Sequence, residues 1–178
     1  MKADYEIRQE TEKDYPQVFK LVEEAFRDME ESDHREQFLV ERLRHSPAFV
    51  PELSLVADGD GGVVGYGLMT RVSIRSGILD AESLALAPVA VRPDRQSMGM
   101  GSPLIRELHA RAARLGYKSA VVLGHEGFYP RFGYRKASDY GIAFPFEVPS
   151  ECCMAVELVA IGLRDIRGVV CYPEAFME

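Results

Sequence analysis

The stretch Leu84–Leu108, LALAPVAVRPDRQSMGMGSPLIREL, joins an apolar run to a helix through a glycine-containing loop. The run that ends at Val91 predicts a buried strand. From residue 104 to 108 the apolar side chains repeat at helical spacing, and Pro103 lies in the first turn, where its missing N–H costs no hydrogen bond. The loop QSMGMG at residues 96–101 therefore opens directly into the N-terminus of a helix.

This loop has the features of an anion-binding site. Glycine lets backbone amides approach a ligand closely, and the amides in the first turn of a helix have no intrahelical partner. They face outward at the positive end of the helix dipole, which suits a pyrophosphate. Pro88 in the preceding strand lacks an N–H, so we expect a bulge or a splayed edge that frees neighbouring backbone groups for a ligand.

Two common phosphate-binding loops are excluded. A P-loop requires Gly-Lys-Ser/Thr, whereas Gly101 is followed by Ser102-Pro103. A dinucleotide-binding loop requires a third glycine near residue 104 and an acidic residue closing the next strand, where Leu123-Gly124 stand. It also requires a parallel sheet, whereas the strands before this loop are joined by short turns.

Apolar periodicity on either side of this segment predicts the order of the elements. The order is strand, two helices, three strands joined by short turns, helix, strand, short helix and two strands. The expected ranges are Tyr5–Arg8, Glu12–Arg27, His34–His45, Leu53–Ala57, Val63–Ile74, Glu82–Val91, a helix over 104–115, Lys118–Leu123, Gly127–Arg131, Gly133–Lys136 and Met154–Leu158.

This order predicts an α/β fold of the mixed, α+β kind, with helices flanking a mostly antiparallel sheet. A helix connects Glu82–Val91 to Ser119–Leu123, so these two strands are expected to form a parallel pair. The length of 178 residues suits one domain. We expect its core over about residues 3–159, with a C-terminal extension over 160–178.

A second motif decides between the remaining possibilities. The loop pattern Gln96-x-x-Gly99-x-Gly101 resembles the coenzyme A loop of the GNAT superfamily of N-acetyltransferases, Gln/Arg-x-x-Gly-x-Gly/Ala after a bulged strand. The segment FYPRFGY at 128–134 resembles the Tyr-x-x-x-Gly-Phe/Tyr signature of the same family. The order of elements resembles the GNAT fold over nearly the whole chain, which implies an acyl-CoA N-acyltransferase fold.

Further segments resemble a subgroup of predicted bacterial N-acetyltransferases, whose members are mostly assigned by similarity. These segments are Leu86–Val91, Leu123–His125 and the tail Gly168–Phe176. One departure is Ser97-Met98, where many relatives have a small or basic pair. It leaves the backbone cradle intact and removes one cationic contact to phosphate.

The resemblance implies acetyl-CoA as cosubstrate and an amine as acceptor. It implies that backbone groups near Val89, Ala90 and Val91 bind the pantetheine arm and the thioester carbonyl. The pyrophosphate is then held by Gln96, Ser97, Met98, Gly99, Met100, Gly101 and Ser102, chiefly through backbone amides. Tyr129 matches the family position that protonates the departing thiolate. A phenol of pKa near ~10 can do this for a thiol of pKa near ~8.5 without large pKa shifts.

The general base is less defined. Glu82 begins the central strand, and related enzymes often place a carboxylate near that strand. His125 and Glu126, beside the second motif, are alternatives, since histidine titrates near neutral pH. Three functions stay open: an active acetyltransferase, an enzyme that uses a longer acyl-CoA, and a non-catalytic acyl-CoA-binding module of the same fold.

Composition narrows the partners. A net charge of −7 argues against a general nucleic-acid-binding protein, which needs a concentrated basic face. No apolar run approaches the ~20 residues that cross a bilayer, and the charged N-terminus lacks the apolar core of a signal peptide, so we expect a cytoplasmic protein. A homodimer is compatible with the resemblance, because dimers are frequent among relatives.

Metal and redox chemistry are not indicated. The three cysteines, Cys152, Cys153 and Cys171, do not form a C-x-x-C motif, and H-E-x-x-H is absent from the sequence. We therefore expect reduced thiols and no metal. His34, His45 and His109 have no metal-ligand spacing, and we expect them at the surface.

Overall fold

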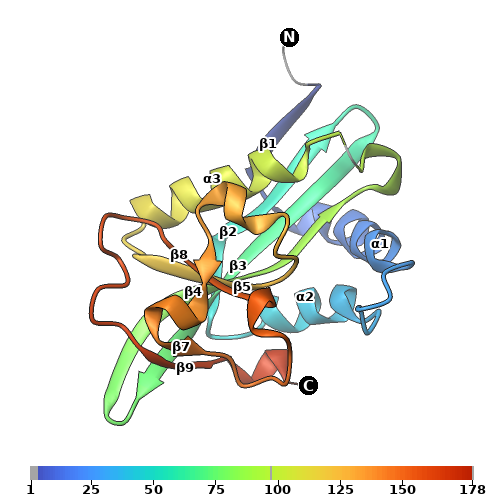
Figure 1. The fold of residues 1–178 in the computed structure, drawn as a ribbon. Helices are drawn as coiled ribbons and strands as arrows, with labels where there is room; N and C mark the ends of the chain where they lie inside the picture. The colour runs from blue at the N-terminus through green and yellow to red at the C-terminus, as the bar shows by residue number, and fades with distance from the viewer. Residues whose placement is uncertain (1–3, 97, 178) are drawn as a thin grey trace.

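The computed structural model describes residues 4–96 and 98–177, and these form a mixed sheet with helices on both faces (Figure 1). The predicted meander is confirmed: β2 (Phe49–Gly59), β3 (Gly62–Ser76) and β4 (Leu79–Val91) pair antiparallel in sequence. A two-residue turn joins β2 to β3, and Gly62 after it has a φ of 114°, which only glycine adopts readily. The three strands extend beyond the predicted ranges, at both ends of β2 and β3 and at the N-terminal end of β4.

The remaining strands extend this meander on both sides. The order across the sheet is β1-β2-β3-β4-β5-β8-β6, with β9 beside β3 and β7 beside β9. Their bounds are β1 (Tyr5–Gln9), β5 (Ser119–Leu123), β6 (Arg135–Lys136), β7 (Ile142–Ala143), β8 (Cys153–Glu157) and β9 (Gly168–Cys171). The predicted parallel pair β4–β5 is confirmed, and the short pair β7–β9 is also parallel.

The α-helices of the described residues, α1 to α3, cover the two faces of the sheet (Figure 1). Helix α3 (Gly101–Arg114) buries its apolar face, including Leu104 and Leu108, in a core with β2 to β5 and β8. Helices α1 (Tyr15–Phe26) and α2 (Glu36–Arg44) pack on the opposite face. This packing fixes the position of α3 on the sheet, and it therefore fixes where the first turn of the helix lies.

The C-terminal residues form part of the sheet. Strand β9 pairs with the far end of β3 around Ile74, and Val170 is buried beside it. Neither β9 nor β7 was predicted, because four and two residues are too short to display an alternating pattern. Their pairing depends on strands that lie at a distance in the sequence.

A buried ion pair ties the N-terminal strand to helix α2. The Arg44 guanidinium contacts the Glu10 carboxylate through two hydrogen bonds, Nε to Oε1 at 3.1 Å and Nη2 to Oε2 at 2.5 Å. Both side chains are more than nine-tenths buried. Ser54 donates a hydrogen bond to Glu10, and Arg44 lies over the Tyr15 ring, 3.8 Å from its centroid. The network therefore joins β1, α1, α2 and β2 in one place.

Removing one partner of this pair is expected to be costly. Arg44→Met leaves the Glu10 carboxylate buried and unpaired, so we expect the free energy of unfolding to fall by about 3 kcal/mol. The control is Arg27→Met, which removes an exposed ion pair to Glu23 and is expected to cost less than about 0.5 kcal/mol. Urea unfolding at pH 7, followed by circular dichroism, measures both. Equal losses in the two variants would contradict the expectation.

Candidate functional site

Strands β4 and β5 separate at one end. Their parallel pairing is recorded at Ala85 and Val121, and within the described residues it does not continue toward the end of β4. On its other side β4 slips by one residue against β3 between Leu86 and Val89, so the bulge predicted at Pro88 is confirmed. The Ala87–Pro88 peptide bond is cis. Because the β4–β5 pairing of the described residues does not continue beyond Ala85, an opening lies between the ends of the two parallel strands.

Two backbone amides of β4 face this opening. Arg92 donates its N–H to the Val64 carbonyl at 2.9 Å, which makes these two residues a hydrogen-bonded pair of the antiparallel ladder. Because such pairs alternate along a ladder, Val89 and Val91 direct their N–H groups away from β3. Ala90 between them turns toward β3. Of the three residues predicted to contact the ligand through their backbone, Val89 and Val91 thus have amides that point away from β3, and the amide of Ala90 belongs to the β3–β4 ladder.

The glycine-containing loop follows immediately. Gln96 folds back on β4 and donates Nε2–H to the Val91 carbonyl at 3.1 Å. Gly99 has a φ of 75°, in the left-handed region that glycine adopts without strain. Met98 is exposed and Met100 is buried in the core below α3. Ser97, also predicted to contribute, lies outside the described residues.

Helix α3 begins at Gly101 without a side-chain cap from the described residues. The first-turn amides, including those of Gly101 and Ser102, therefore lack intrahelical partners and carry the positive end of the helix dipole. The nearby guanidinium groups are engaged: Arg92 pairs with Asp94 at 2.6 Å and Arg95 with Asp4 at 2.8 Å. Backbone amides are thus the principal donors that this loop offers to an anion.

The second motif lies next to the loop. A methyl group added to Gly101 would be 3.9 Å from both the Phe128 ring and the Val91 side chain. Tyr129, which begins the 3₁₀ helix η3 (Tyr129–Phe132), packs edge-to-face on Phe128 with ring centroids 5.0 Å apart. The end of β4, the start of α3 and the tyrosine segment therefore meet at the opening between β4 and β5.

The Tyr129 hydroxyl makes no hydrogen bond to any of the described residues, and it is not among the fully buried polar atoms. Burial of the ring raises the pKa of this phenol, so it stays protonated throughout the neutral range. A protonated hydroxyl with no competing protein acceptor can donate to a ligand atom. This is the chemical requirement for a general acid.

His109 corrects a prediction, because this residue is half-buried and does not lie on the surface. Its Nε2 lies 2.9 Å from the Tyr134 hydroxyl oxygen, and the two share a hydrogen bond. Burial, and then the charge of Arg106, lower the pKa of His109 to about 4. Periodicity could not separate this position from a solvent-facing one, since it borders the apolar stripe of α3. His34 and His45 are exposed as predicted.

This histidine makes stability depend on pH. Between pH ~6.5 and about 4 the unfolded chain binds a proton at His109 that the folded protein does not, so acidification favours unfolding. From pH 7 to 4.5 we expect this residue alone to lower the free energy of unfolding by about 2 to 3 kcal/mol. His109→Gln keeps a partner for Tyr134 but cannot titrate. Urea unfolding at both pH values should therefore give a smaller acid loss in the variant, and identical losses would refute the assignment.

The predicted base does not join this cluster. Glu82 is exposed near the start of β4, seven residues before Val89, which is about 23 Å along an extended strand. His125 and Glu126 are also exposed, but they lie in the loop directly before η3, and His125 Nδ1 accepts the Gly127 N–H at 2.9 Å. Of the three candidates for the general base, His125 and Glu126 are therefore closer to Tyr129 in the sequence than Glu82 is.

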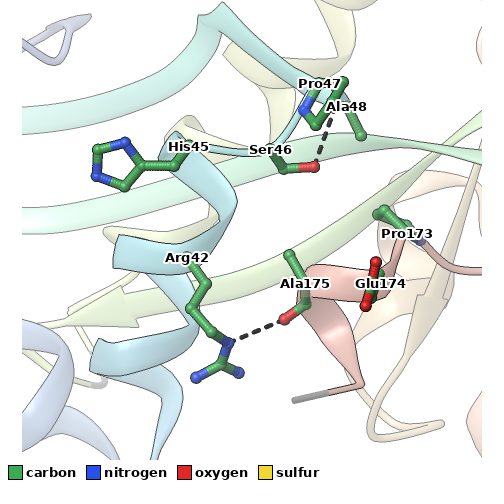
Figure 2. Close-up of a pocket in the computed structure, with 8 residues that line it drawn as sticks. All are labelled: Arg42, His45, Ser46, Pro47, Ala48, Pro173, Glu174 and Ala175. Carbon is green, nitrogen blue, oxygen red and sulfur yellow. Dashed lines mark hydrogen bonds between the residues drawn. The ribbon is translucent and has the colours of Figure 1, made fainter.

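A hollow on the surface lies away from this opening (Figure 2). It has a volume of about 650 Å³ and lies between the C-terminal end of α2, the loop to β2 and the tail. Arg42 donates Nε–H to the Ala175 carbonyl at 3.0 Å across it, and Ser46 accepts the Ala48 N–H at 3.1 Å. None of the residues predicted from sequence to bind the cofactor lines this hollow.

Two further observations concern chemistry outside the opening. The thiols Cys152, Cys153 and Cys171 are free, and within residues 4–96 and 98–177 no three His, Cys, Asp or Glu side chains gather as metal ligands. The helices of the same residues include none with the length and apolarity needed to span a membrane.

Comparisons with known proteins define the family. The model of the acetyltransferase (GNAT) domain matches residues 6–137. The chain is 37% identical over 131 residues to the uncharacterized N-acetyltransferase YjhQ of Escherichia coli K12, covering 71% of this chain and 72% of the relative. The chain therefore belongs to the GNAT acetyltransferase family, and it is an acyltransferase by class.

Solved structures have the same architecture. The N-acetyltransferase YhbS of Escherichia coli, crystallised with CoA, superposes with a TM-score of 0.87 at 27% identity and covers 100% of this chain and 94% of its own. A GNAT acetyltransferase from Brucella melitensis in complex with acetyl-CoA gives 0.79 at 32% identity, with 97% of each chain covered.

Proposed function

We propose that this protein transfers an acetyl group from acetyl-CoA to a primary amine. The observation that carries the proposal is the pair of outward amides at Val89 and Val91, in the opening that the Gly101 helix start and Tyr129 also border. The residues fit a pyrophosphate joined to an extended thioester arm, because the helix start offers backbone donors and the opening offers an unpaired strand edge. Two relatives were crystallised with CoA or acetyl-CoA, which supports the same choice of ligand.

The chemistry assigns a task to each group. The neutral amine attacks the thioester carbon, a C–N bond forms and the C–S bond breaks, and CoA leaves as a thiolate. The amides of Val89 and Val91 stabilise the arm and the charge that develops on the carbonyl oxygen. Tyr129 donates its proton to the thiolate and regains one from solvent. The proton lost by the amine passes to solvent through His125, Glu126 or, over a longer water chain, Glu82.

The proposal covers the chain as one catalytic domain over residues 1–178, acting in the cytoplasm. The acceptor is a small molecule or a peptide amine, and a homodimer is compatible with the assignment. A specific amine is not proposed, because the fold leaves the acceptor to its loops. The competing function is an acyl-CoA-binding module without turnover.

Calorimetric titration tests the ligand first. Acetyl-CoA is expected to bind with a micromolar dissociation constant, more tightly than free CoA, and NAD is expected not to bind. Release of free thiol is then measured with a panel of primary amines. Binding without thiol release from any amine would favour the non-catalytic module, and absence of acetyl-CoA binding would refute the proposed ligand altogether.

A further inference from the structure

Gly124 lies directly against the Tyr129 ring. A Cβ atom added to Gly124 would lie 2.3 Å from Cε2 of Tyr129, 2.9 Å from Cδ2 and 3.2 Å from Cζ. These distances are far below van der Waals contact, and they involve the edge of the phenol ring that leads to its hydroxyl. No side chain larger than hydrogen fits here while Tyr129 keeps its place.

The need for glycine at this position is one of space. The φ of Gly124 lies outside the left-handed region, so alanine could adopt the same backbone. The residue cannot easily move away either, since its N–H donates to the Cys152 carbonyl at 3.0 Å, which continues the pairing of β5 with β8. An added methyl group must therefore displace the tyrosine ring.

The Tyr129 ring is also in contact with a second residue, Tyr134. The two rings pack edge-to-face, with centroids 5.8 Å apart, and Tyr134 is buried and hydrogen-bonded to His109 on α3. The start of η3 adds backbone restraint, because Phe128 donates its N–H to the His125 carbonyl at 3.1 Å. The ring thus lies between a strand end and a residue anchored on the helix whose N-terminus borders the opening.

We propose that Gly124 is a positioning residue, which keeps the Tyr129 hydroxyl at the opening between β4 and β5 by leaving room for its ring. The inference rests on the proposed function, in which Tyr129 protonates the leaving thiolate. Gly124 has no side chain to offer a substrate or cofactor, and its N–H is bonded to the Cys152 carbonyl. Its effect on the reaction passes wholly through Tyr129.

The test is a double-mutant comparison of wild type, Gly124→Ala, Tyr129→Phe and the double variant, each assayed for kcat and for acetyl-CoA dissociation constant. Gly124→Ala is expected to lower kcat 10- to 100-fold, since a displacement of about 1 Å in a reacting group costs that much, and to change the dissociation constant less than about 3-fold. In the Tyr129→Phe background the same substitution is expected to change kcat less than about 2-fold. If Gly124→Ala lowered kcat by the same factor in the Tyr129→Phe background as in wild type, the inference would be overturned.

Gly59→Ala, at the end of β2, is the control at a glycine outside the site. A methyl group there would meet the Asp4 carbonyl oxygen at 3.3 Å and no atom of Tyr129, so kcat is expected to stay within about 2-fold of wild type. If Tyr129→Phe alone leaves kcat unchanged, the acid role fails and the inference fails with it. If Tyr129→Phe lowers kcat and Gly124→Ala does not, only the positioning inference is refuted.

Stability provides a readout that does not need turnover. Thermal unfolding is expected to show a lower midpoint for Gly124→Ala than for wild type. Adding Tyr129→Ala to Gly124→Ala removes the ring that the methyl group meets, so the loss of midpoint caused by Gly124→Ala is expected to fall to less than half in that background. If Gly124→Ala lowered the midpoint as much without the Tyr129 ring as with it, the methyl group would clash with another residue and the inference would be overturned. This readout applies even if Gly124→Ala is too unstable for an activity assay.

Discussion

Tyr129→Phe is expected to lower kcat about 10²- to 10³-fold while leaving the acetyl-CoA dissociation constant within about 3-fold of wild type. The substitution keeps the ring, and therefore the packing against Phe128 and Tyr134, and removes only the hydroxyl. That hydroxyl has no hydrogen-bond partner among the described residues, so its loss leaves no orphaned protein group. The expected loss is therefore in proton donation to the thiolate.

The pH dependence of kcat distinguishes this role from simple packing. Burial raises the pKa of Tyr129, so a wild-type enzyme that depends on the protonated phenol should keep its activity on the alkaline side up to pH ~10. A fall in kcat that begins well below pH 9 would argue against this donor. Steady-state assays of thiol release across pH 6 to 10 measure the profile, and Tyr134→Phe is the comparison. Tyr134→Phe loses a buried hydrogen bond to His109, so we expect its free energy of unfolding to fall and its pH profile of kcat to keep the shape of the wild-type profile.

Gly101→Glu is expected to weaken acetyl-CoA binding by at least about 100-fold. It places a carboxylate at the first residue of α3, beside the amides proposed to receive the pyrophosphate. The position itself tolerates a side chain, since a methyl group would approach no described atom closer than 3.9 Å and the φ is not left-handed. The loss should therefore come from charge and from occupation of the ligand site, and the free energy of unfolding should change little.

Gly101→Gln separates these two causes. It has nearly the same shape as the glutamate variant and no charge, so the difference in dissociation constant between the two reports the electrostatic part. That difference should shrink as salt increases from 50 to 500 mM, because screening weakens the interaction between charges at an exposed site. Equal dissociation constants for the two variants in low salt would contradict an anion-binding role for this helix start.

Much of the fold follows from local patterns. Alternating apolar residues in the middle of the chain predicted the meander, and the helical repeat after Pro103 predicted α3 and the parallel crossover. Pro88 predicted a bulge or a splayed edge, because it has no N–H to donate to the strand ladder, and the structure has the bulge. Strand β9 escaped prediction because its only signal is its pairing with β3, about a hundred residues earlier in the chain.

The candidate site divides in the same way. The loop at 96–101 was found from its glycines and the helix start that follows it, and Tyr129 was found from the resemblance of residues 128–134 to the tyrosine signature of the family. Gly124 and His109 were missed in their structural roles, because a glycine and a helical histidine have many uses. Their partners, the ring of Tyr129 and the hydroxyl of Tyr134, are set only by packing. For Glu82 the residue type suited a general base, but its position near the start of β4 places it far along the strand from Val89 and Val91.

The sequence by itself determined the class of this protein, because the strand–loop–helix segment and the tyrosine motif are local patterns that together resemble one family. Only the tertiary structure decided which amides of β4 face the opening, how far Glu82 stands from it, and why residue 124 must be glycine. Those facts depend on ladder register and on contacts between side chains far apart in the chain, which arise from the cooperative packing of the whole sheet and not from any one segment.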